Sequence, residues 1–284
     1  MRLRCGPTSL DLTTPIVMGI LNVTPDSFSD GGRFSDAQAA VEHALAMVEA
    51  GAGIIDVGGE STRPGAAAVS ETDEIRRVVP VIAALAPRVR VPISLDTSKP
   101  GVIREAVLAG ATMVNDVRAL RDDGALQAAA ASSAAICLMH MQGEPRTMQA
   151  DPQYVNVVAD VRAFLESRIQ ACVEAGIARD RLAIDPGIGF GKRTAHNLAL
   201  LAALPELASL GLPLLVGVSR KSLFRELLGR PVGQRLAGGV AMATAAVLAG
   251  AHIVRTHDVA ETVDAVRVAS ALQAAGYGRE KSSS

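Results

Sequence analysis

The stretch Ile16-Val-Met-Gly-Ile-Leu-Asn22 contains the pattern that decides the predicted fold. Its first six residues are uncharged and largely apolar without alternation, and the polar Asn22 follows directly. A continuous apolar run is typical of a strand that is buried on both faces, as in a parallel sheet. Seven more strand-like runs, most of them also continuous, follow along the chain: Gly53–Val57, Val91–Leu95, Thr112–Val114, Ala135–Met139, Leu182–Ile184, Leu214–Val216 and His252–Arg255.

Helical patterns fill the gaps between these runs. Several end at a glycine, such as Gly51 or Gly211, which suits a helix C-cap, and Ser70 is a suitable N-cap. Eight alternations of strand and helix predict a (β/α)8 TIM barrel of the α/β class, with an open doubly wound sheet as the structural alternative. The predicted helices are Ala37–Ala50, Glu71–Leu85, Gly101–Ala109, Asp123–Ser132, Tyr154–Ala175, Asn197–Leu210, Ser219–Leu228, Leu236–Ala249 and Val259–Ala275.

The length of 284 residues suits a single barrel domain, since such barrels take roughly 250 residues. We expect residues 1–14 to form an N-terminal segment that covers the barrel bottom, residues 15–277 to form the barrel, and residues 278–284 to be a frayed tail. Hydrophobic residues make up 49% of the chain, aromatic residues only 2%, and Trp is absent. The core is therefore predicted to be aliphatic.

Charge, cysteine content and apolar stretches limit the partners and the compartment. The net charge is −1 and no run of like charge stands out, which argues against nucleic-acid binding. Cys5, Cys137 and Cys172 lie far apart without a CxxC pair, so we expect neither a disulfide framework nor a zinc site. We therefore expect the protein in the reducing cytoplasm. The N-terminus lacks the apolar region of a signal peptide, and the longest apolar stretch, Leu236–Ala251, is short for a membrane span.

A polar group ends or follows every predicted strand. One such group per strand, eight times over, is what a barrel needs to build an active site at the carboxyl ends of its strands. Helix N-capping explains a single Asp in such a position, but it does not readily explain the joint pattern. The groups, in chain order, are Asn22; Asp56 and Glu60; Asp96; Asn115 and Asp116; His140; Asp185; Ser219 and Lys221; and Arg255 and His257.

Several loops after these strands look functional. Asn22–Gly32 and Gly58–Gly65 are long, polar and rich in glycine, and the second offers hydroxyls and Arg63 to an anion. Ser219–Ser222 is predicted to open a helix, whose N–H groups favour an anion. Asp185–Lys192 resembles a phosphate loop but fails both the Walker A and the dinucleotide patterns, so we interpret it as a flexible loop that places Phe190 beside a ligand ring.

Eight motifs in order together resemble the dihydropteroate synthase family: Asn22–Gly32, Asp56–Gly65, Ser94–Thr97, Asn115–Val117, Leu138–Gly143, Asp185–Gly191, Gly217–Lys221 and Arg255–Asp258. The resemblance spans nearly the whole chain. Arg118 and Val218 depart from the residues common in the family, without touching the chemistry. The resemblance implies condensation of p-aminobenzoate with 7,8-dihydropterin-6-ylmethyl diphosphate in folate biosynthesis, with Mg²⁺ as cofactor. It also implies a homodimer and a sulfonamide target.

The resemblance and the position of each residue together suggest its role. Asp96, Asn115 and Asp185 would match the N–H edge of the pterin, and Lys221 would donate to the ring, while Met139 and Phe190 would pack on its faces. The pterin diphosphate site is completed by Thr62, Gly217, Arg255 and His257, and Asn22 corresponds to the family's Mg²⁺ ligand. Phe28, Arg63, Pro64, Lys221 and Ser222 are expected in the p-aminobenzoate pocket. Lys221, Asp96, Asp185 and Arg255 are the predicted catalytic residues.

Two other functions remain open at this point. A barrel that transfers a methyl group from a reduced pterin would share the Asp and Asn contacts but has no use for a diphosphate site. A pterin-binding homologue without synthase activity should have degraded first and second loops, whereas Asn22–Gly32 and Gly58–Gly65 are intact. The predicted chemistry is a displacement of SN1-like character. The protein would assist it mainly by positioning the substrates and by stabilising the departing diphosphate.

Overall fold

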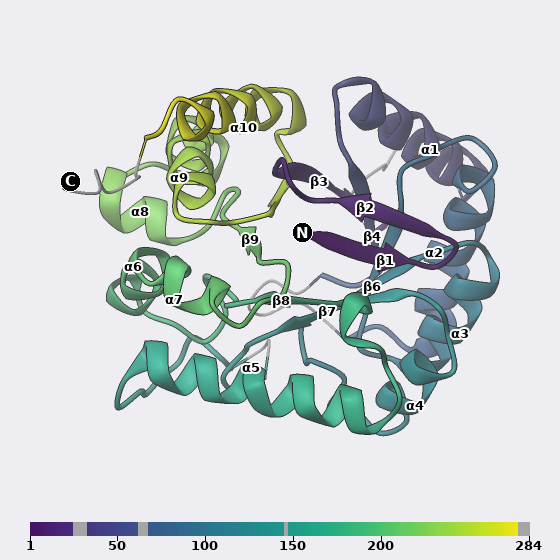
Figure 1. Cartoon of the computed structure of the whole chain (residues 1–284). Helices are drawn as coiled ribbons and strands as arrows, with labels where there is room; N and C mark the ends of the chain where they lie inside the picture. Colours follow the sequence, from purple (N-terminus) through teal and green to yellow (C-terminus); the bar gives the residue numbers. More distant parts are fainter. Residues whose placement is uncertain (25–32, 62–67, 145–146, 278–284) are drawn as a thin grey trace.

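The computed structural model describes residues 1–24, 33–61, 68–144 and 147–277, and Figure 1 shows their arrangement. Eight parallel strands form one sheet in the order β8-β7-β6-β5-β4-β3-β10-β9. The last strand of the chain pairs with the first strand of this sheet, and an Ile184–Leu214 bridge joins the two remaining edges. The sheet therefore closes into the predicted (β/α)8 barrel, and the open doubly wound alternative is wrong.

Each barrel strand corresponds to one of the predicted runs. The structure extends most runs at their carboxyl end, so that several of the polar residues belong to the strands themselves. The strands are β3 (Ile16–Asn22), β4 (Ile54–Gly58), β5 (Ile93–Asp96), β6 (Met113–Asp116), β7 (Ala135–Met139), β8 (Leu182–Asp185), β9 (Leu215–Gly217) and β10 (Ile253–Thr256).

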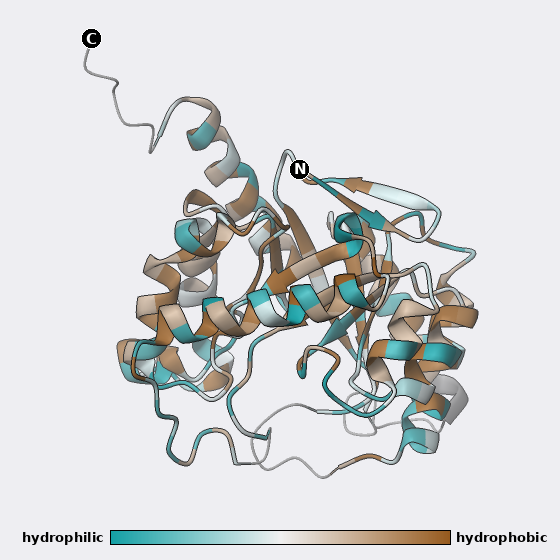
Figure 2. Ribbon diagram, turned by 60° about the horizontal axis from the view of Figure 1, so that its bottom comes forward, coloured by the Kyte–Doolittle hydropathy of each residue, from teal (hydrophilic) through white to brown (hydrophobic). Residues whose placement is uncertain are grey.

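The helices surround the barrel (Figure 1) and pack on it through buried apolar residues, and Figure 2 shows that hydrophilic and hydrophobic residues alternate along them. They are α1 (Arg33–Glu49), α2 (Glu71–Leu85), α3 (Pro100–Leu108), α4 (Ala125–Ala130), α5 (Val157–Glu174), α6 (Thr194–Ala202), α7 (Leu204–Ala208), α8 (Leu223–Leu228), α9 (Leu236–Leu248) and α10 (Val259–Ala274), with short 3₁₀ turns at Arg179–Arg181 and Val232–Gln234. Ser70 caps α2 as predicted, because its side chain accepts from the Asp73 N–H.

Two predicted helices need correction. The predicted helix Asn197–Leu210 is two helices, α6 and α7, and Pro205 lies in the first turn of α7, where it needs no N–H partner. The predicted helix Ser219–Leu228 begins only at Leu223. Arg220 has a φ of +57°, which an α-helix cannot contain, so the chain after β9 first makes a turn.

The N-terminal residues form an antiparallel hairpin, β1 (Arg2–Cys5) and β2 (Thr8–Asp11), whose strands were not among the predicted ones. Leu3, Cys5 and Leu12 are buried in one cluster with residues from inside the barrel, among them Met18, Ile54, Met113, Leu215 and Ile253. These barrel residues lie at or near the starts of their strands. The hairpin therefore packs against the amino-terminal end of the barrel and leaves the other end for the polar residues.

A larger aliphatic cluster fills the space between the strands and the helices, as the composition predicts. Among the described helices, none combines the length and the apolar character that crossing a membrane requires. The expected frayed tail, residues 278–284, lies outside the described residues.

Candidate active site

Strand register brings the polar residues to one end of the barrel. Asn22 pairs with Gly58, Gly58 with Asp96, and Asp96 with Asn115 across neighbouring strands. On the opposite side of the barrel, Met139 pairs with Asp185, and Gly217 pairs with Arg255. Parallel strands end together, so residues from distant parts of the chain gather at one rim.

Arg255 is the central cation of this rim. Its Nε donates to Asp56 Oδ2 at 2.6 Å, and its Nη2 donates to Asp96 Oδ2 at 2.6 Å. Asn115 Nδ2 also donates to Asp56 Oδ2, at 3.1 Å. Burial alone would lower the pKa of Arg255, but the charges of Asp56 and Asp96 outweigh it and raise the pKa, so the guanidinium stays charged.

Asp56 is fully buried and connects two predicted site residues, yet its position in the sequence predicted no role for it. The available signal was a carboxylate inside an otherwise apolar strand. Such a group is costly to bury unless it is paired and hydrogen-bonded. Its partners lie 59 and 199 residues away in the chain, so no local pattern identifies them.

Three acceptor oxygens at this rim have no hydrogen-bond partner among the described residues. They are Asp56 Oδ1, Asp96 Oδ1 and Asn115 Oδ1, each on a residue that is at most 8% exposed. Buried polar atoms in proteins are nearly always satisfied, because an unmet acceptor costs free energy. Three such oxygens on neighbouring strands therefore indicate a site for a molecule that presents several donors.

The ionisation of the carboxylates depends on burial and on the nearby cations. Burial raises the pKa of Asp96 to about 7, although Arg255 opposes this effect. Burial also raises the pKa of Asp185, against a 2.7 Å hydrogen bond from the Gly187 N–H to Asp185 Oδ1 and against the charge of Lys221. Burial lowers the pKa of Lys221 to about 8, with Asp185 acting in the opposite direction.

An apolar wall lies beside these polar groups. Met139 and Phe190 belong to one buried cluster with Val117, Met141 and Met148. Lys221 Nζ lies 4.2 Å from the centroid of the Phe190 ring, a cation–π distance. The arrangement combines a line of acceptors, an ammonium group and an apolar surface, which suits a flat heterocycle.

The loop after β8 is closely hydrogen-bonded in this structure, which argues against the flexible loop predicted from the sequence. Its backbone carbonyls receive hydrogen bonds from Gln149, Tyr154 and Lys192, and its Gly189 N–H donates to Asn197. The loop presents Phe190 at the rim as predicted. Lys192 was not identified as a functional residue from the sequence.

The segment after β9 lies beside the end of β10. Ser219 Oγ is 3.1 Å from His257 Nδ1, and Arg220 forms an ion pair with Asp258. Ser222 is exposed, and its side chain makes no capping hydrogen bond to α8. A helix N-terminus that opens at Ser219 is therefore not available for an anion, and Ser222 offers its hydroxyl instead.

Asn22 is the last residue of β3 and the only predicted metal ligand. Among the described residues, no group of three or more His, Cys, Asp or Glu side chains is placed to hold a metal ion. One neutral amide fits a Mg²⁺ that takes most of its ligands from substrate phosphates and water, and it does not fit a dedicated protein cage.

Four predicted site residues, Phe28, Thr62, Arg63 and Pro64, lie outside the described residues. Glu60, just before residues 62–67, contacts Val69, just after them. Its Oε1 accepts from the Val69 N–H at 3.1 Å, and its other oxygen pairs with Lys99, which also pairs with the buried Glu74. The described residues Glu60 and Val69, which flank this segment, are thus in contact near the end of β4.

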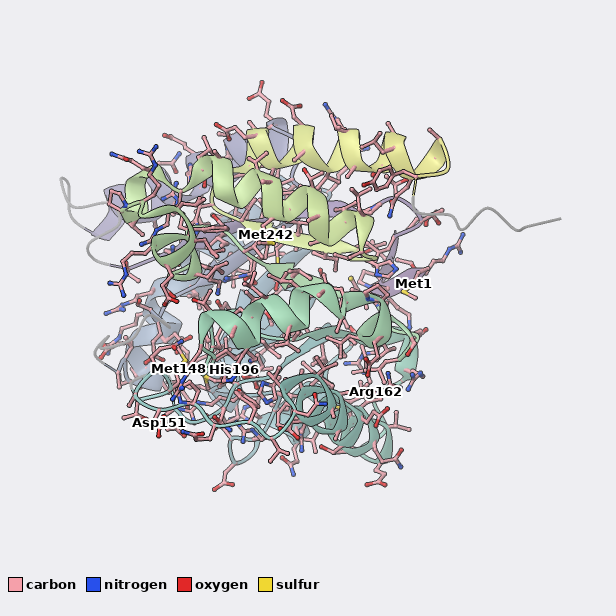
Figure 3. All side chains as sticks on the ribbon, turned by 90° about the vertical axis from the view of Figure 1, so that its left-hand side faces the viewer. Met1, Met148, Asp151, Arg162, His196 and Met242 are labelled. Carbon is pink, nitrogen blue, oxygen red and sulfur yellow. The ribbon has the colours of Figure 1, made fainter. Side chains whose placement is uncertain are left out.

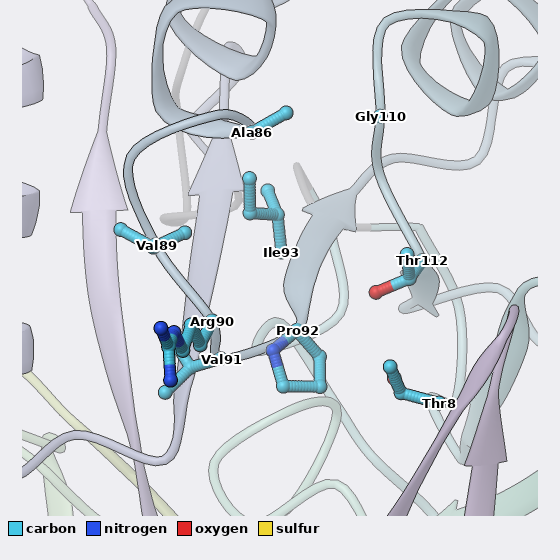
Figure 4. Close-up of a pocket in the computed structure, with 9 residues that line it drawn as sticks. All are labelled: Thr8, Ala86, Val89, Arg90, Val91, Pro92, Ile93, Gly110 and Thr112. Carbon is cyan, nitrogen blue, oxygen red and sulfur yellow. The ribbon is translucent and has the colours of Figure 1, made fainter.

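A small pocket lies at the opposite end of the barrel (Figure 4). Thr8 of the hairpin and Ile93, the first residue of β5, both line it. It is separate from the rim, because Asp96 is at the other end of the same strand.

Comparison with known proteins gives one consistent result. A family model described as "Pterin binding enzyme" matches residues 18–257. The chain is 55% identical over 275 residues to the dihydropteroate synthase of Escherichia coli (strain K12), covering 97% of this chain and 98% of that protein.

Two solved structures are similar over nearly the whole chain. The Yersinia pestis dihydropteroate synthase with a sulfonamide drug superposes with a TM-score of 0.92 at 53% identity, covering 96% of this chain and 100% of that one. The Xanthomonas albilineans dihydropteroate synthase with 4-aminobenzoic acid gives a TM-score of 0.91 at 53% identity, covering 96% and 98%.

Proposed function

This chain belongs to the dihydropteroate synthase family, and we propose that the rim residues described above carry out the reaction of that family. The resemblance seen in the sequence is thereby confirmed. The chain is a transferase that joins p-aminobenzoate to 7,8-dihydropterin-6-ylmethyl diphosphate and releases diphosphate and 7,8-dihydropteroate. A methyl-transferring barrel and an inactive pterin-binding homologue are disfavoured by the identity to dihydropteroate synthases over nearly the full chain.

The observation that carries the proposed roles is the set of unpartnered oxygens on Asp56, Asp96 and Asn115. A pterin presents ring and exocyclic N–H donors along one edge. Several acceptors in a dry site bind such an edge well, and ionised acceptors make the stronger hydrogen bonds. Asp185 adds a fourth acceptor from the opposite side of the barrel, where Gly187 already orients its carboxylate.

Lys221 and the apolar wall complete the pterin slot. The ammonium of Lys221 faces Asp185, Asp96 and Arg255. From this place it donates to the ring carbonyl or to a ring nitrogen of the pterin. Met139 and Phe190 cover the ring faces, which excludes water and strengthens the polar contacts.

The diphosphate lies toward the ends of β9 and β10. Arg255, Gly217 and His257 surround this place, and Thr62 is proposed to close over the leaving group. Arg255 is shared between two carboxylates, so it contributes to the pterin slot as well as to the diphosphate site. Asn22 would hold Mg²⁺, which supplies charge neutralisation to the diphosphate when it is bound.

The proposed reaction is a displacement with SN1-like character. The bond from the pterin methylene to the diphosphate oxygen breaks, and the electron pair leaves with the diphosphate. The amine nitrogen of p-aminobenzoate forms the new bond to the methylene carbon, and its proton passes to solvent. The pterin ring delocalises the positive charge that develops. Asp96, Asp185, Lys221 and Arg255 hold the ring and the departing anion in place, which is the main catalytic contribution of the protein.

The p-aminobenzoate site is proposed from Phe28, Arg63, Pro64, Lys221 and Ser222. Ser222 is exposed at the turn before α8, and its hydroxyl donates to the carboxylate of the substrate. A sulfonamide would occupy the same place, as an amine-bearing analogue of this substrate.

The homodimer remains a proposal, supported by one apolar face of the molecule. Exposed leucines lie on α6, on α8 and at the start of α9, and an exposed valine lies on the 3₁₀ turn between α8 and α9; Figure 3 shows this face with His196 and Met242 labelled. Contiguous exposed apolar residues mark association surfaces. The exposed residues are Leu198, Leu227, Leu228, Val232 and Leu236. The cytoplasmic location is likewise proposed, from three buried cysteines that form no disulfide.

The experiment that tests the function is an assay with the pterin diphosphate, p-aminobenzoate and Mg²⁺. We expect 7,8-dihydropteroate and diphosphate in equal amounts. If no dihydropteroate forms at high enzyme concentration, the assignment is wrong. Transfer of a methyl group from a methylated reduced pterin would support the rival function instead.

A further inference from the structure

Lys192 is a buried cation to which the reaction described above gives no role. The residue is 3% exposed, and its ammonium contacts four polar atoms. Nζ donates to the carbonyl oxygens of Gly187 at 2.9 Å and Phe190 at 3.0 Å, and to that of His140 at 3.3 Å. It also lies 2.9 Å from His140 Nδ1.

The loop that Lys192 organises carries two elements of the proposed pterin slot. Gly187 donates its N–H to the Asp185 carboxylate, and Phe190 places its ring below the Lys221 ammonium. The carbonyl groups of these same two residues accept from Lys192. The loop approaches its neighbour so closely that a Cβ on Gly187 would lie 1.9 Å from the His140 carbonyl oxygen.

His140 forms the other half of this contact. It follows Met139 at the end of β7, and its N–H donates to the Asp185 carbonyl at 3.0 Å. Burial, with the charge of Lys192 adding to it, lowers the pKa of His140 to about 3. The imidazole is therefore neutral, and Nδ1 accepts the hydrogen bond, since an ammonium has donors only.

We propose that Lys192 is a positioning residue of the pterin site, which locks the Asp185–Phe190 loop to the end of β7 and so sets the spacing of Asp185, Phe190 and Lys221. The inference rests on the proposed function of that site. An ammonium suits this task because it makes several short hydrogen bonds from one point, which no uncharged side chain of this length does.

Burial lowers the pKa of Lys192 to about 7, with Asp185 acting in the opposite direction. The charge that Lys192 carries below this pH also acts on Asp185. Burial raises the pKa of this carboxylate, and the Gly187 N–H, Lys221, Arg255 and Lys192 oppose the effect. Cys137 on β7 also faces Asp185, and its thiol stays neutral because burial raises its pKa. The neutral His140 lies beside Lys192. Loss of Lys192 therefore raises the pKa of Asp185 further, and the acidic limb of the kcat/KM profile should move to higher pH.

The test is Lys192→Met, compared with Arg193→Met as a matched control. Met keeps the length of the side chain and removes the charge and the hydrogen bonds. Arg193 is the next residue and loses the same charge, but its side chain is 60% exposed and pairs with Asp151. We expect Lys192→Met to lower kcat/KM for the pterin diphosphate on the order of 100-fold, with the KM for p-aminobenzoate within about twofold. Arg193→Met should match the wild type in both constants and in its pH profile.

A purely structural role predicts a different outcome. If Lys192→Met lowers Tm but leaves the kinetic constants and the acidic limb unchanged, the proposal is wrong. Should Lys192→Met not fold, Lys192→Gln, which retains an amide donor, takes its place, and calorimetric affinity for the pterin diphosphate is the readout. An unchanged affinity in a folded Lys192→Gln protein also overturns the proposal. Wild-type turnover in the same assay shows that any failure concerns Lys192 and not the function.

Discussion

Asp96 accepts from Arg255 through one carboxylate oxygen, Oδ2, at 2.6 Å, while its Oδ1 is buried without a partner among the described residues. Asp56 likewise accepts from the Arg255 guanidinium through Oδ2, at 2.6 Å, and its Oδ1 is also buried without a partner among the described residues. In each pair one oxygen holds the cation, and the other is left for a donor on the substrate. The cation that orients the carboxylates is thus part of the pterin slot.

Asp56→Asn should impair catalysis although no role was predicted for this residue from the sequence. An amide oxygen can still accept from both Arg255 and Asn115, but the substitution removes the negative charge that pairs with Arg255 and replaces the unpartnered Oδ1 by an NH2 donor, which cannot accept from the pterin. We expect kcat/KM to fall about 100-fold, measured with saturating p-aminobenzoate. Asp180→Asn, which removes an exposed carboxylate at the other end of the barrel, is the control and should retain full activity. Equal activity of the two variants would contradict the role of Asp56.

Asp185→Asn should weaken pterin binding selectively. The substitution replaces a charge-assisted acceptor by a neutral amide while the Gly187 N–H can still be satisfied. The loss should be about 1.5–3 kcal/mol of binding free energy, measured by calorimetry with the pterin diphosphate. The affinity for p-aminobenzoate in the presence of diphosphate should stay unchanged. A variant that loses only thermal stability would show that Asp185 is structural.

Arg255→Ala should reduce binding of the diphosphate group most. Comparison of the pterin diphosphate with the corresponding hydroxymethyl pterin separates the two contributions. We expect the diphosphate form to lose affinity by a larger factor, because the guanidinium is the charged donor between the slot and the leaving group. The hydroxymethyl form should also lose some affinity, since two buried carboxylates lose their cation. Equal factors for the two ligands would place Arg255 in the pterin slot alone.

Pterin binding should be strongest between about pH 7 and pH 8. Burial raises the pKa of Asp96 to about 7 and also raises the pKa of Asp185, so toward acidic pH both carboxylates become protonated and accept less well. Lys221 has a pKa lowered to about 8, so above this value it loses its charge. Affinity should therefore fall on both sides of this window, as fluorescence titration with the pterin would measure. In Lys221→Met the alkaline fall should disappear while the acidic fall remains.

Gly187→Ala should destabilise the protein far more than Gly211→Ala. Both glycines have a positive φ, of 68° and 72°, which an alanine adopts at a cost of about 1 kcal/mol. At Gly187 the added Cβ would also meet the His140 carbonyl at 1.9 Å, whereas at Gly211 nothing lies within 4 Å. Urea unfolding should show a loss near 1 kcal/mol for Gly211→Ala and a loss several times larger for Gly187→Ala. Similar losses would mean that the loop after β8 can move away.

The sequence predicted the fold well because a strand that is buried on both faces is a continuous apolar run in the sequence. All eight barrel strands overlap the predicted runs, and α2 spans Glu71–Leu85 as predicted. The hairpin at residues 2–11 was missed, since its short strands lack a continuous apolar run. The helix after β9 was predicted too early, because Ser219 resembles an N-cap while the left-handed Arg220 has no signature in the sequence.

The polar residues at the strand ends can be identified from the sequence, because parallel strands bring such residues to one rim wherever they occur in the chain. How these residues are paired is seen only in the folded barrel. Asp56 meets Arg255 across 199 residues, and Lys192 meets His140 across 52. Apolar periodicity is a local property of the chain, whereas the partner of a buried charge is set by which side chains face one another inside the closed barrel.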